Sequence, residues 1–134
     1  MDERIDLSEE SDLYSATLRC REFALRAGLD QVRAQKLATA ASELTRNVHK
    51  YAGGYGTVML SLITEADIQW LQLEVSDQGP GIADLETAML DHYSTSGTLG
   101  LGLPGVKRLV DDFTIKSEPG QGTHVTVRMQ CRPT

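Results

Sequence analysis

Apolar residues recur at helical spacing in the first half of this chain. After Asp30 they fall at offsets of 4, 3, 4 and 3, which is the spacing of one helical face. We expect Asp30 to cap this helix and Gly53-Gly54 to end it. The positions that define the apolar face are Leu37, Ala41, Leu44, Val48 and Tyr51.

Elsewhere apolar and polar residues alternate, which is typical of strands with one buried face. Two strands are predicted on either side of the short connection Glu65-Ala-Asp67, and two more on either side of Pro119-Gly-Gln-Gly122. A short strand is expected near the N-terminus. The five predicted strands are Arg4–Leu7, Gly56–Thr64, Ile68–Ser76, Phe113–Ser117 and Thr123–Met129.

The remaining segments favour helices and one mobile stretch. Polar and small residues dominate 91–99, so we expect this segment to move. Because the strands come in adjacent pairs, the pattern predicts an α+β sandwich over residues 1–134, with helices on one face of a mostly antiparallel sheet. The other predicted helices run from a cap on Ser8 or Ser11 to about Ala27, over Asp84–Leu90, and over Gly100–Asp111.

Composition excludes several classes of protein. The net charge of −6 argues against nucleic-acid binding, which leaves a basic footprint. No apolar run approaches the ~20 residues of a membrane span, and the charged start Met1-Asp-Glu-Arg4 is unlike an export signal. Cys20 and Cys131 are therefore expected to be reduced thiols in the cytoplasm, with no membrane contact.

Glu43 and Asn47 each precede an apolar position of the main helix, so both lie on one flank of its apolar face. Lys36, Ala40 and Lys50 share that flank. A Glu there can accept a proton from an attacking hydroxyl, and an Asn carbonyl is a hard oxygen ligand suited to Mg²⁺. The same pair is also compatible with an ordinary solvated helix face.

Asp77 follows a buried strand and runs into a loop that contains Gly79 and Gly81. A carboxylate at that position needs a hydrogen-bond donor. The exocyclic amine of adenine is such a donor, whereas guanine presents a carbonyl that would repel a carboxylate. The glycines allow close approach of a ligand, although Asp, Gly and Pro are also the residues of simple turns.

The run from Gly100 to Gly105 matches G-x-G-x-x-G, but its context excludes the familiar readings of that pattern. No buried strand precedes it, as a dinucleotide fold requires, and neither the protein-kinase motifs nor a Walker A lysine accompanies it. Amides at the start of a helix, together with the helix dipole, favour phosphate. Pro104 suits the first helical turn.

Taken together and in their order along the chain, these segments resemble the motifs of the GHKL ATPase and kinase superfamily. Glu43-x-x-x-Asn47 is similar to its N box, Asp77-x-Gly79-x-Gly81 to its G1 box, and Gly100-Leu-Gly102-Leu to its G2 box. Gly120-Gln-Gly122-Thr is similar to the last glycine box. Ser42-Glu-Leu-Thr-Arg-Asn with Tyr51-Ala-Gly, and the run from Gly100 to Leu109, are most similar to the RsbT branch of the small bacterial anti-sigma and switch kinases (the RsbW/SpoIIAB/RsbT group).

This resemblance implies a role for each matching residue. It implies that Glu43 is the general base, that Asn47 is the Mg²⁺ ligand, and that Asp77 holds the adenine amine with Thr123 assisting through water. The expected lid, residues 82–99, contains no Lys or Arg. If the γ-phosphate needs a basic lid residue, Lys50 or Lys107 is expected to serve instead; otherwise slow turnover is expected. The residues expected to bind ATP are Asn47, Lys50, Tyr51, Asp77, Gly79, Gly81, Ile82, Ser96, Gly97, Gly100, Leu101, Gly102, Leu103 and Thr123.

The resemblance also implies a function, with alternatives. The chain is expected to be an ATP- and Mg²⁺-dependent serine/threonine kinase that phosphorylates STAS-domain regulators in a bacterial stress-signalling partner switch. Added charge would release it from them, and it would then bind and activate a PP2C-type phosphatase. The alternatives are an anti-sigma factor that sequesters a sigma factor and phosphorylates its antagonist, a detached histidine-kinase catalytic domain, and a domain of this fold without nucleotide activity.

Overall fold

The computed structural model describes residues 2–81 and 102–131, apart from the side chain of Tyr51. Three predictions concern residues outside the described ones: the helix Asp84–Leu90, the mobility of 91–99 and the lid at 82–99. Within them, the sheet has the order β1-β2-β3-β5-β4 and every neighbouring pair is antiparallel. Its strands are β1 (Asp2–Leu7), β2 (Gly56–Glu65), β3 (Ile68–Asp77), β4 (Asp112–Glu118) and β5 (Gly122–Gln130).

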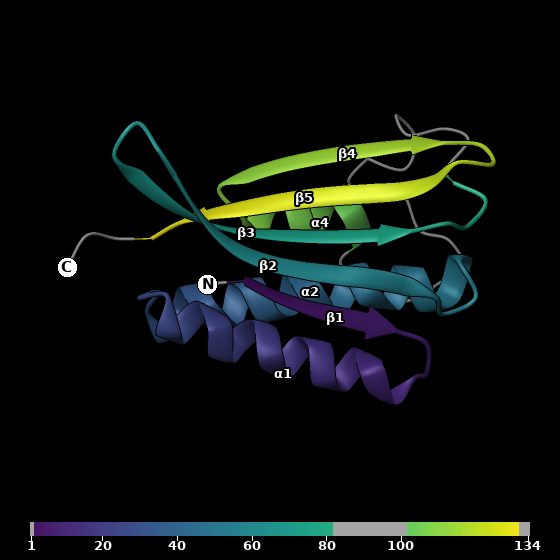
Figure 1. Ribbon diagram of the computed structural model, residues 1–134, viewed down its shortest axis with the longest axis horizontal. Coiled ribbons are helices and arrows are strands. Elements are labelled where there is room, and N and C mark those ends of the chain that lie inside the picture. The colour runs from purple at the N-terminus through teal and green to yellow at the C-terminus, as the bar shows by residue number, and fades with distance from the viewer. Residues whose placement is uncertain (1, 82–101, 132–134) are drawn as a thin grey trace.

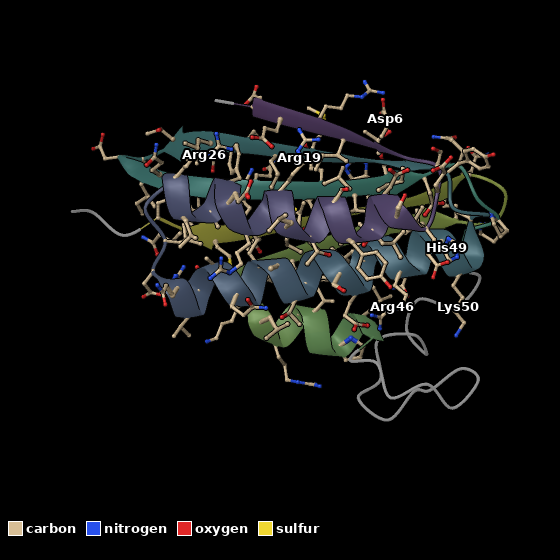
Figure 2. The ribbon with its side chains drawn as sticks, turned by 90° about the horizontal axis from the view of Figure 1, so that it is seen from below. Asp6, Arg19, Arg26, Arg46, His49 and Lys50 are labelled. Atoms are coloured by element: carbon tan, nitrogen blue, oxygen red, sulfur yellow. The ribbon has the colours of Figure 1, made fainter. Side chains whose placement is uncertain are left out.

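Three described helices cover one face of this sheet (Figure 1). They are α1 (Ser11–Arg26), α2 (Gln31–Tyr51) and α4 (Gly102–Leu109). Figure 2 shows α2 lying between α1 and α4, and α2 packs against both neighbours. The predicted α+β sandwich with helices on one face is therefore confirmed. None of the described helices combines the length and the apolar character that crossing a membrane requires.

The core lies between the helices and the sheet. Leu37, Ala41, Leu44 and Val48 of α2 are each at most 2% exposed, as their spacing predicted. The strands supply alternate residues to the same core, with Leu71, Leu73 and Val75 of β3 as an example. Both cysteines are buried and unpaired, and burial raises the pKa of the Cys20 thiol to about 12.

The predicted caps are partly right. Asp30 caps α2, because its carboxylate accepts the Arg33 N–H at 2.8 Å. The predicted cap of α1 on Ser8 or Ser11 is wrong. The cap position is Glu10, which makes no side-chain capping bond. Asp12, inside the first turn, instead accepts the N–H groups of residues 8 and 9 at 2.8 Å each.

The helix predicted over Gly100–Asp111 ends earlier than expected, at Leu109. Asp111 is taken out of helical geometry by β5, because its N–H donates to the carbonyl of Arg128. Its carboxylate accepts bonds from Arg33 Nη2 and from the N–H of Gln130, both at 2.7 Å. Asp111 therefore joins the end of α4 to both α2 and β5.

Candidate nucleotide site

The flank of α2 that carries Glu43 and Asn47 runs along the border between core and solvent. Ala40, one turn before the pair, is fully buried. Glu43 and Asn47 are half-buried, and Lys50 is exposed. The helix therefore places a carboxylate and an amide, four residues apart, where solvent is partly excluded. The predicted placement of both residues on one half-buried flank agrees with this structure.

Glu43 is paired with an arginine that sequence reasoning missed. Arg46 Nη1 lies 3.3 Å from Glu43 Oε1, one helical turn further along α2. The Glu43 side chain is 13% exposed, while that of Arg46 is 57% exposed. Because the arginine lies three residues after the glutamate, helical spacing alone could have identified the pair. Arg46 thus gives the half-buried carboxylate a cationic partner at the protein surface.

Asn47 suits a magnesium ion that takes most of its ligands from water and phosphate. Among the described residues there is no cluster of three or more His, Cys, Asp or Glu side chains that could hold a metal. Mg²⁺ keeps several waters and completes its shell with phosphate oxygens when protein ligands are few. The Asn47 amide oxygen therefore suits an ion that arrives with a nucleotide triphosphate, and it does not suit a permanently bound ion.

The loop after β3 is built by close packing. Asp77 accepts the N–H of Gly79 at 2.8 Å, which closes a short turn. A Cβ at Gly79 would lie 2.7 Å from the Cβ of Ala52, at the end of α2. A Cβ at Gly81 would lie 2.1 Å from the carbonyl oxygen of Glu118. These glycines are therefore required by protein contacts, whatever they also allow a ligand to do.

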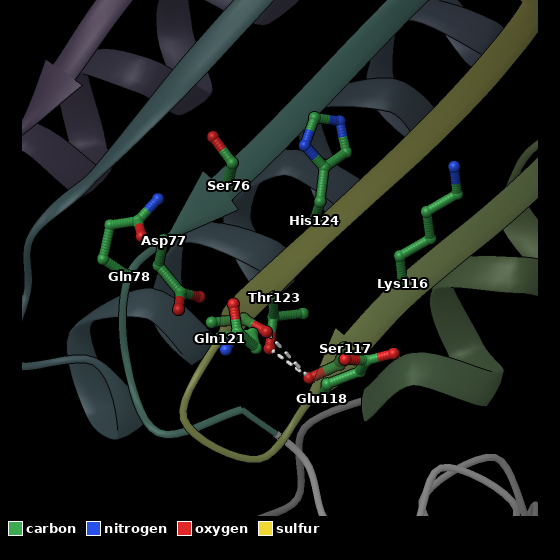
Figure 3. Close-up of a pocket in the computed structure, with 10 residues that line it drawn as sticks. Ser76, Asp77, Gln78, Lys116, Ser117, Glu118, Gln121, Thr123 and His124 are labelled. Carbon is green, nitrogen blue, oxygen red and sulfur yellow. Dashed lines mark hydrogen bonds between the residues drawn. The ribbon is translucent and has the colours of Figure 1, made fainter.

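A pocket of about 500 Å³ opens at this end of the sheet. Asp77 of β3 is the register partner of Thr123 of β5, which in turn pairs with Ser117 of β4. Strand alternation directs these three side chains to the helix side, whereas Ser76, Lys116 and His124 point to the other face (Figure 3). The structure thus places two predicted site residues, Asp77 and Thr123, opposite each other on neighbouring strands. Ser117 was missed, because alternation along β4 gives only its face and the register with β5 is what places it beside Thr123.

The start of α4 supplies backbone amides. Gly102 has φ +64°, a conformation that favours glycine, and α4 begins there. The first amides of a helix have no carbonyl partner within it, so those of Gly102 and Leu103 suit a phosphate. Five predicted positions lie outside the described residues, as does the side chain of Tyr51. They are Ile82, Ser96, Gly97, Gly100 and Leu101.

Core contacts hold the end of α2 beside the Asp77 end of the sheet. Gly56 of β2 is the register partner of Asp77, and a Cβ on Gly56 would lie 2.8 Å from Cγ1 of Val48. Val48 directly follows Asn47 in α2. Figure 2 shows Arg46, His49 and Lys50 gathered at the same end of the helix. The helix flank, the Asp77 loop and the row Asp77–Thr123–Ser117 therefore lie at one end of the molecule.

Comparison with known proteins identifies relatives of this chain. A family model described as "Histidine kinase-, DNA gyrase B-, and HSP90-like ATPase" matches residues 32–133. The serine/threonine-protein kinase RsbT of Bacillus subtilis is 40% identical over 121 residues, which is 90% of each chain. An anti-sigma F factor of Bacillus licheniformis is 33% identical over 125 residues, 89% of this chain and 83% of the relative.

Solved structures show the same fold. A mycobacterial sensor histidine kinase, MprB, superposes with a TM-score of 0.60 at 20% identity and covers 100% of both chains. A chain of the SiaB–SiaC complex from Pseudomonas aeruginosa superposes with a TM-score of 0.60 at 13% identity, covering 96% of this chain and 89% of that chain. At these identities the likeness concerns the fold alone.

Proposed function

Because this chain belongs to the family of histidine kinase-, DNA gyrase B- and HSP90-like ATPases, we propose that it is an ATP- and Mg²⁺-dependent serine/threonine protein kinase. The observation that carries the proposal is the half-buried Glu43, one helical turn before Asn47 on the same flank of α2. A protein that only bound nucleotide would need a metal ligand and a base-recognition site. It would not need a partly desolvated carboxylate beside them.

In this proposal each group has one task. Glu43 accepts the proton of a serine or threonine hydroxyl as its oxygen bonds to the γ-phosphorus. The bond from that phosphorus to the bridging oxygen breaks, and ADP leaves with the electron pair. Asn47 would hold Mg²⁺, which neutralises phosphate charge when it is bound. The amides of Gly102 and Leu103 hold phosphate oxygens, and Asp77 accepts the exocyclic amine of adenine.

The substrates we propose are STAS-domain regulators of a bacterial stress-signalling switch. Support comes from the similarity to RsbT, named a serine/threonine-protein kinase, over 90% of both chains. Phosphorylation would place charge in an interface and release the kinase. The released kinase would then bind and activate a PP2C-type phosphatase in the cytoplasm.

Phosphate transfer tests the proposal. Wild type, Glu43→Gln and the exposed control Glu22→Gln are incubated with [γ-³²P]ATP, Mg²⁺ and a purified STAS-domain protein. We expect wild type and Glu22→Gln to label serine or threonine, and Glu43→Gln to transfer at least about 100-fold more slowly. Binding of ATP is measured separately and should be similar in all three proteins. Equal transfer by wild type and Glu43→Gln would refute the role of the base.

A second candidate function is favoured by the anti-sigma F factor relatives, one of which is 33% identical over 89% of this chain. In that case the chain would sequester a sigma factor, and phosphorylation of an antagonist protein would relieve the inhibition. A pulldown with purified sigma factor separates the two functions. Retention of the sigma factor at micromolar concentration with ATP present would favour the anti-sigma function, while retention of the STAS-domain protein alone favours the switch kinase.

Base selection tests the nucleotide assignment separately from catalysis. Wild type should bind ATP and leave GTP largely unbound, because the guanine carbonyl would face the Asp77 carboxylate. Asp77→Asn replaces one acceptor oxygen with an amide donor and should weaken ATP by about 10-fold or more. Equal affinity of wild type for ATP and GTP in a calorimetric titration would show that Asp77 does not read the base.

A further inference from the structure

Two hydroxyl groups meet at the end of the pocket beside Asp77. The Ser117 Oγ lies 2.8 Å from the Thr123 Oγ1 and 3.1 Å from the carbonyl oxygen of Gly122. Figure 3 shows both contacts as dashed lines leaving Ser117. Both side chains are half-buried, so the geometry of this small network is set by the protein and is only partly open to solvent.

The acceptor-only character of a carbonyl sets the direction of one bond and constrains the other. A hydroxyl has one hydrogen to donate and two lone pairs to accept with, whereas a carbonyl oxygen accepts only. The contact with Gly122 therefore uses the single hydrogen of Ser117. While that hydrogen is directed at Gly122, the bond between the two hydroxyls runs from Thr123 to Ser117. Thr123 has no second hydrogen, so its oxygen faces any further neighbour as an acceptor.

The register partner of Thr123 also presents acceptors. Asp77 accepts the N–H of Gly79 through Oδ1, and an ionised carboxylate has no hydrogen to donate. Asp77 and Thr123 are directly opposite on β3 and β5, and both residues line the pocket. An amino group carries two hydrogens and matches two neighbouring acceptors. A carbonyl oxygen at the same place would meet lone pairs on both sides.

We propose that Ser117 is a positioning residue that fixes the Thr123 hydroxyl as an acceptor. The Asp77 end of the pocket thereby selects a ligand that carries an amino group and disfavours one that carries a carbonyl. Ser117 acts through Thr123, and the amine reaches Thr123 directly or through one water. This inference rests on the proposed binding of ATP, for which it names a specificity-determining contact outside the predicted site residues.

The test compares ATP with purine riboside 5′-triphosphate, which carries hydrogen in place of the exocyclic amine. Affinities of the full chain for both are measured by calorimetry with Mg²⁺ for wild type, Ser117→Ala, Thr123→Val and the double variant. Thr114→Ala, on the same strand but on the exposed face, is the matched control. A purely structural loss at Ser117 would weaken both ligands alike and leave the ratio of their affinities unchanged.

We expect Ser117→Ala to reduce the preference for ATP over purine riboside 5′-triphosphate about 3- to 10-fold, which corresponds to the loss of one hydrogen bond. Thr123→Val should do the same, and the double variant should match Thr123→Val within about twofold, because in this proposal the effect of Ser117 on the choice of ligand passes through that hydroxyl. Ser117→Thr, which keeps a hydroxyl, should retain the preference. Ser117→Cys replaces Ser117→Ala in the same comparison if the alanine variant does not fold.

Two results would overturn the inference while leaving ATP binding in place. One is an unchanged preference in Ser117→Ala, and the other is a double variant that loses the product of the two single effects. A wild type that binds both triphosphates equally would instead remove the proposed recognition of adenine, and the role of Ser117 with it. Binding of neither triphosphate by wild type would refute the proposed function itself.

Discussion

Removing the Asp111 carboxylate should destabilise the protein in a way that depends on pH. This side chain accepts two hydrogen bonds, from Arg33 Nη2 and from the N–H of Gln130, at 2.7 Å each. Arg33 is only 18% exposed, and its Nε is buried without a hydrogen-bond partner in the part of the chain that the structure describes. Asp111→Ala would leave this guanidinium without its carboxylate, although Nη2 keeps its bond to the carbonyl of Gln130.

The magnitude follows from these contacts. A hydrogen bond to a charged group contributes about 1.5–3 kcal/mol. The Asp111 side chain is 36% exposed, so solvent screening reduces that figure, and we expect a loss of about 2 kcal/mol for the two bonds together. At about 2.1 cal/mol/K per residue, the unfolding entropy is about 0.28 kcal/mol/K, which converts this loss to a fall in Tm of about 7 °C.

The sign of the pH dependence is fixed by the direction of the pKa shift. Burial alone would raise the pKa of Asp111, but the hydrogen bonds from Gln130 and Arg33 and the positive charges of Arg33 and Lys36 outweigh it and lower the pKa. A carboxyl with a lowered pKa in the folded state stabilises the protein above its unfolded pKa of about 3.9. This contribution disappears as pH falls through the lower folded value.

Urea unfolding at a series of pH values checks the reasoning. Asp111→Ala should cost about 2 kcal/mol near pH 7, and the difference from wild type should shrink below about pH 4. Asp6→Ala is the matched control, because the Arg4–Asp6 pair is close in distance, at 3.0 Å, but is 65% and 73% exposed. It should cost at most about 0.5 kcal/mol. Equal losses for the two variants, or a loss at Asp111 that persists unchanged at pH 3, would refute the argument.

Three further predictions concern single positions. Ala66 lies in the β2–β3 turn with φ +51°, so Ala66→Gly should raise stability by about 1 kcal/mol in thermal unfolding, and a lowered Tm would contradict this. Arg46→Gln should change the free energy of unfolding by no more than about 0.5 kcal/mol. It should slow phosphate transfer several-fold at unchanged ATP affinity, because Glu43 loses its cationic partner, and Arg46→Lys should recover most of the rate. Phosphate transfer by Arg46→Gln at the wild-type rate would exclude a role of Arg46 in supporting Glu43. Cys20 is fully buried and its pKa is raised to about 12. It should therefore resist a thiol reagent at pH 8 in the folded protein and react at once in 6 M guanidinium. Rapid labelling of Cys20 in the native protein would contradict its burial.

Periodicity predicted the elements well where one physical effect dominates. The apolar face of α2 was recognisable because burying Leu37, Leu44 and Val48 against a sheet outweighs every local preference. The strands were recognisable for the same reason. The predicted site residues that share one element, Glu43 and Asn47, also have their relation fixed by helix geometry alone.

Sequence reasoning failed where a distant group decides the local structure. The end of α4 is set by Asp111, whose partners are far away in the chain, on α2 and β5. The start of α1 was misassigned for a local reason instead: Asp12, inside the first turn, accepts the N–H groups of residues 8 and 9, where a serine cap was expected. Ser117 was missed because its role depends on which strand lies beside β4 and in which register. Pairing between strands is not encoded in any single window of the sequence.

The contact between Val48 and Gly56 has a consequence for protein engineering. Val48 belongs to the hydrophobic core, but its chain neighbour is Asn47 and the residue it touches is paired with Asp77. A core variant chosen to raise thermal stability, such as Val48→Ile, would push the last turns of α2 away from β2 and change the span between the phosphate end and the base end of the proposed nucleotide site. Selection for heat resistance and selection for ATP affinity would therefore compete at this one methyl group.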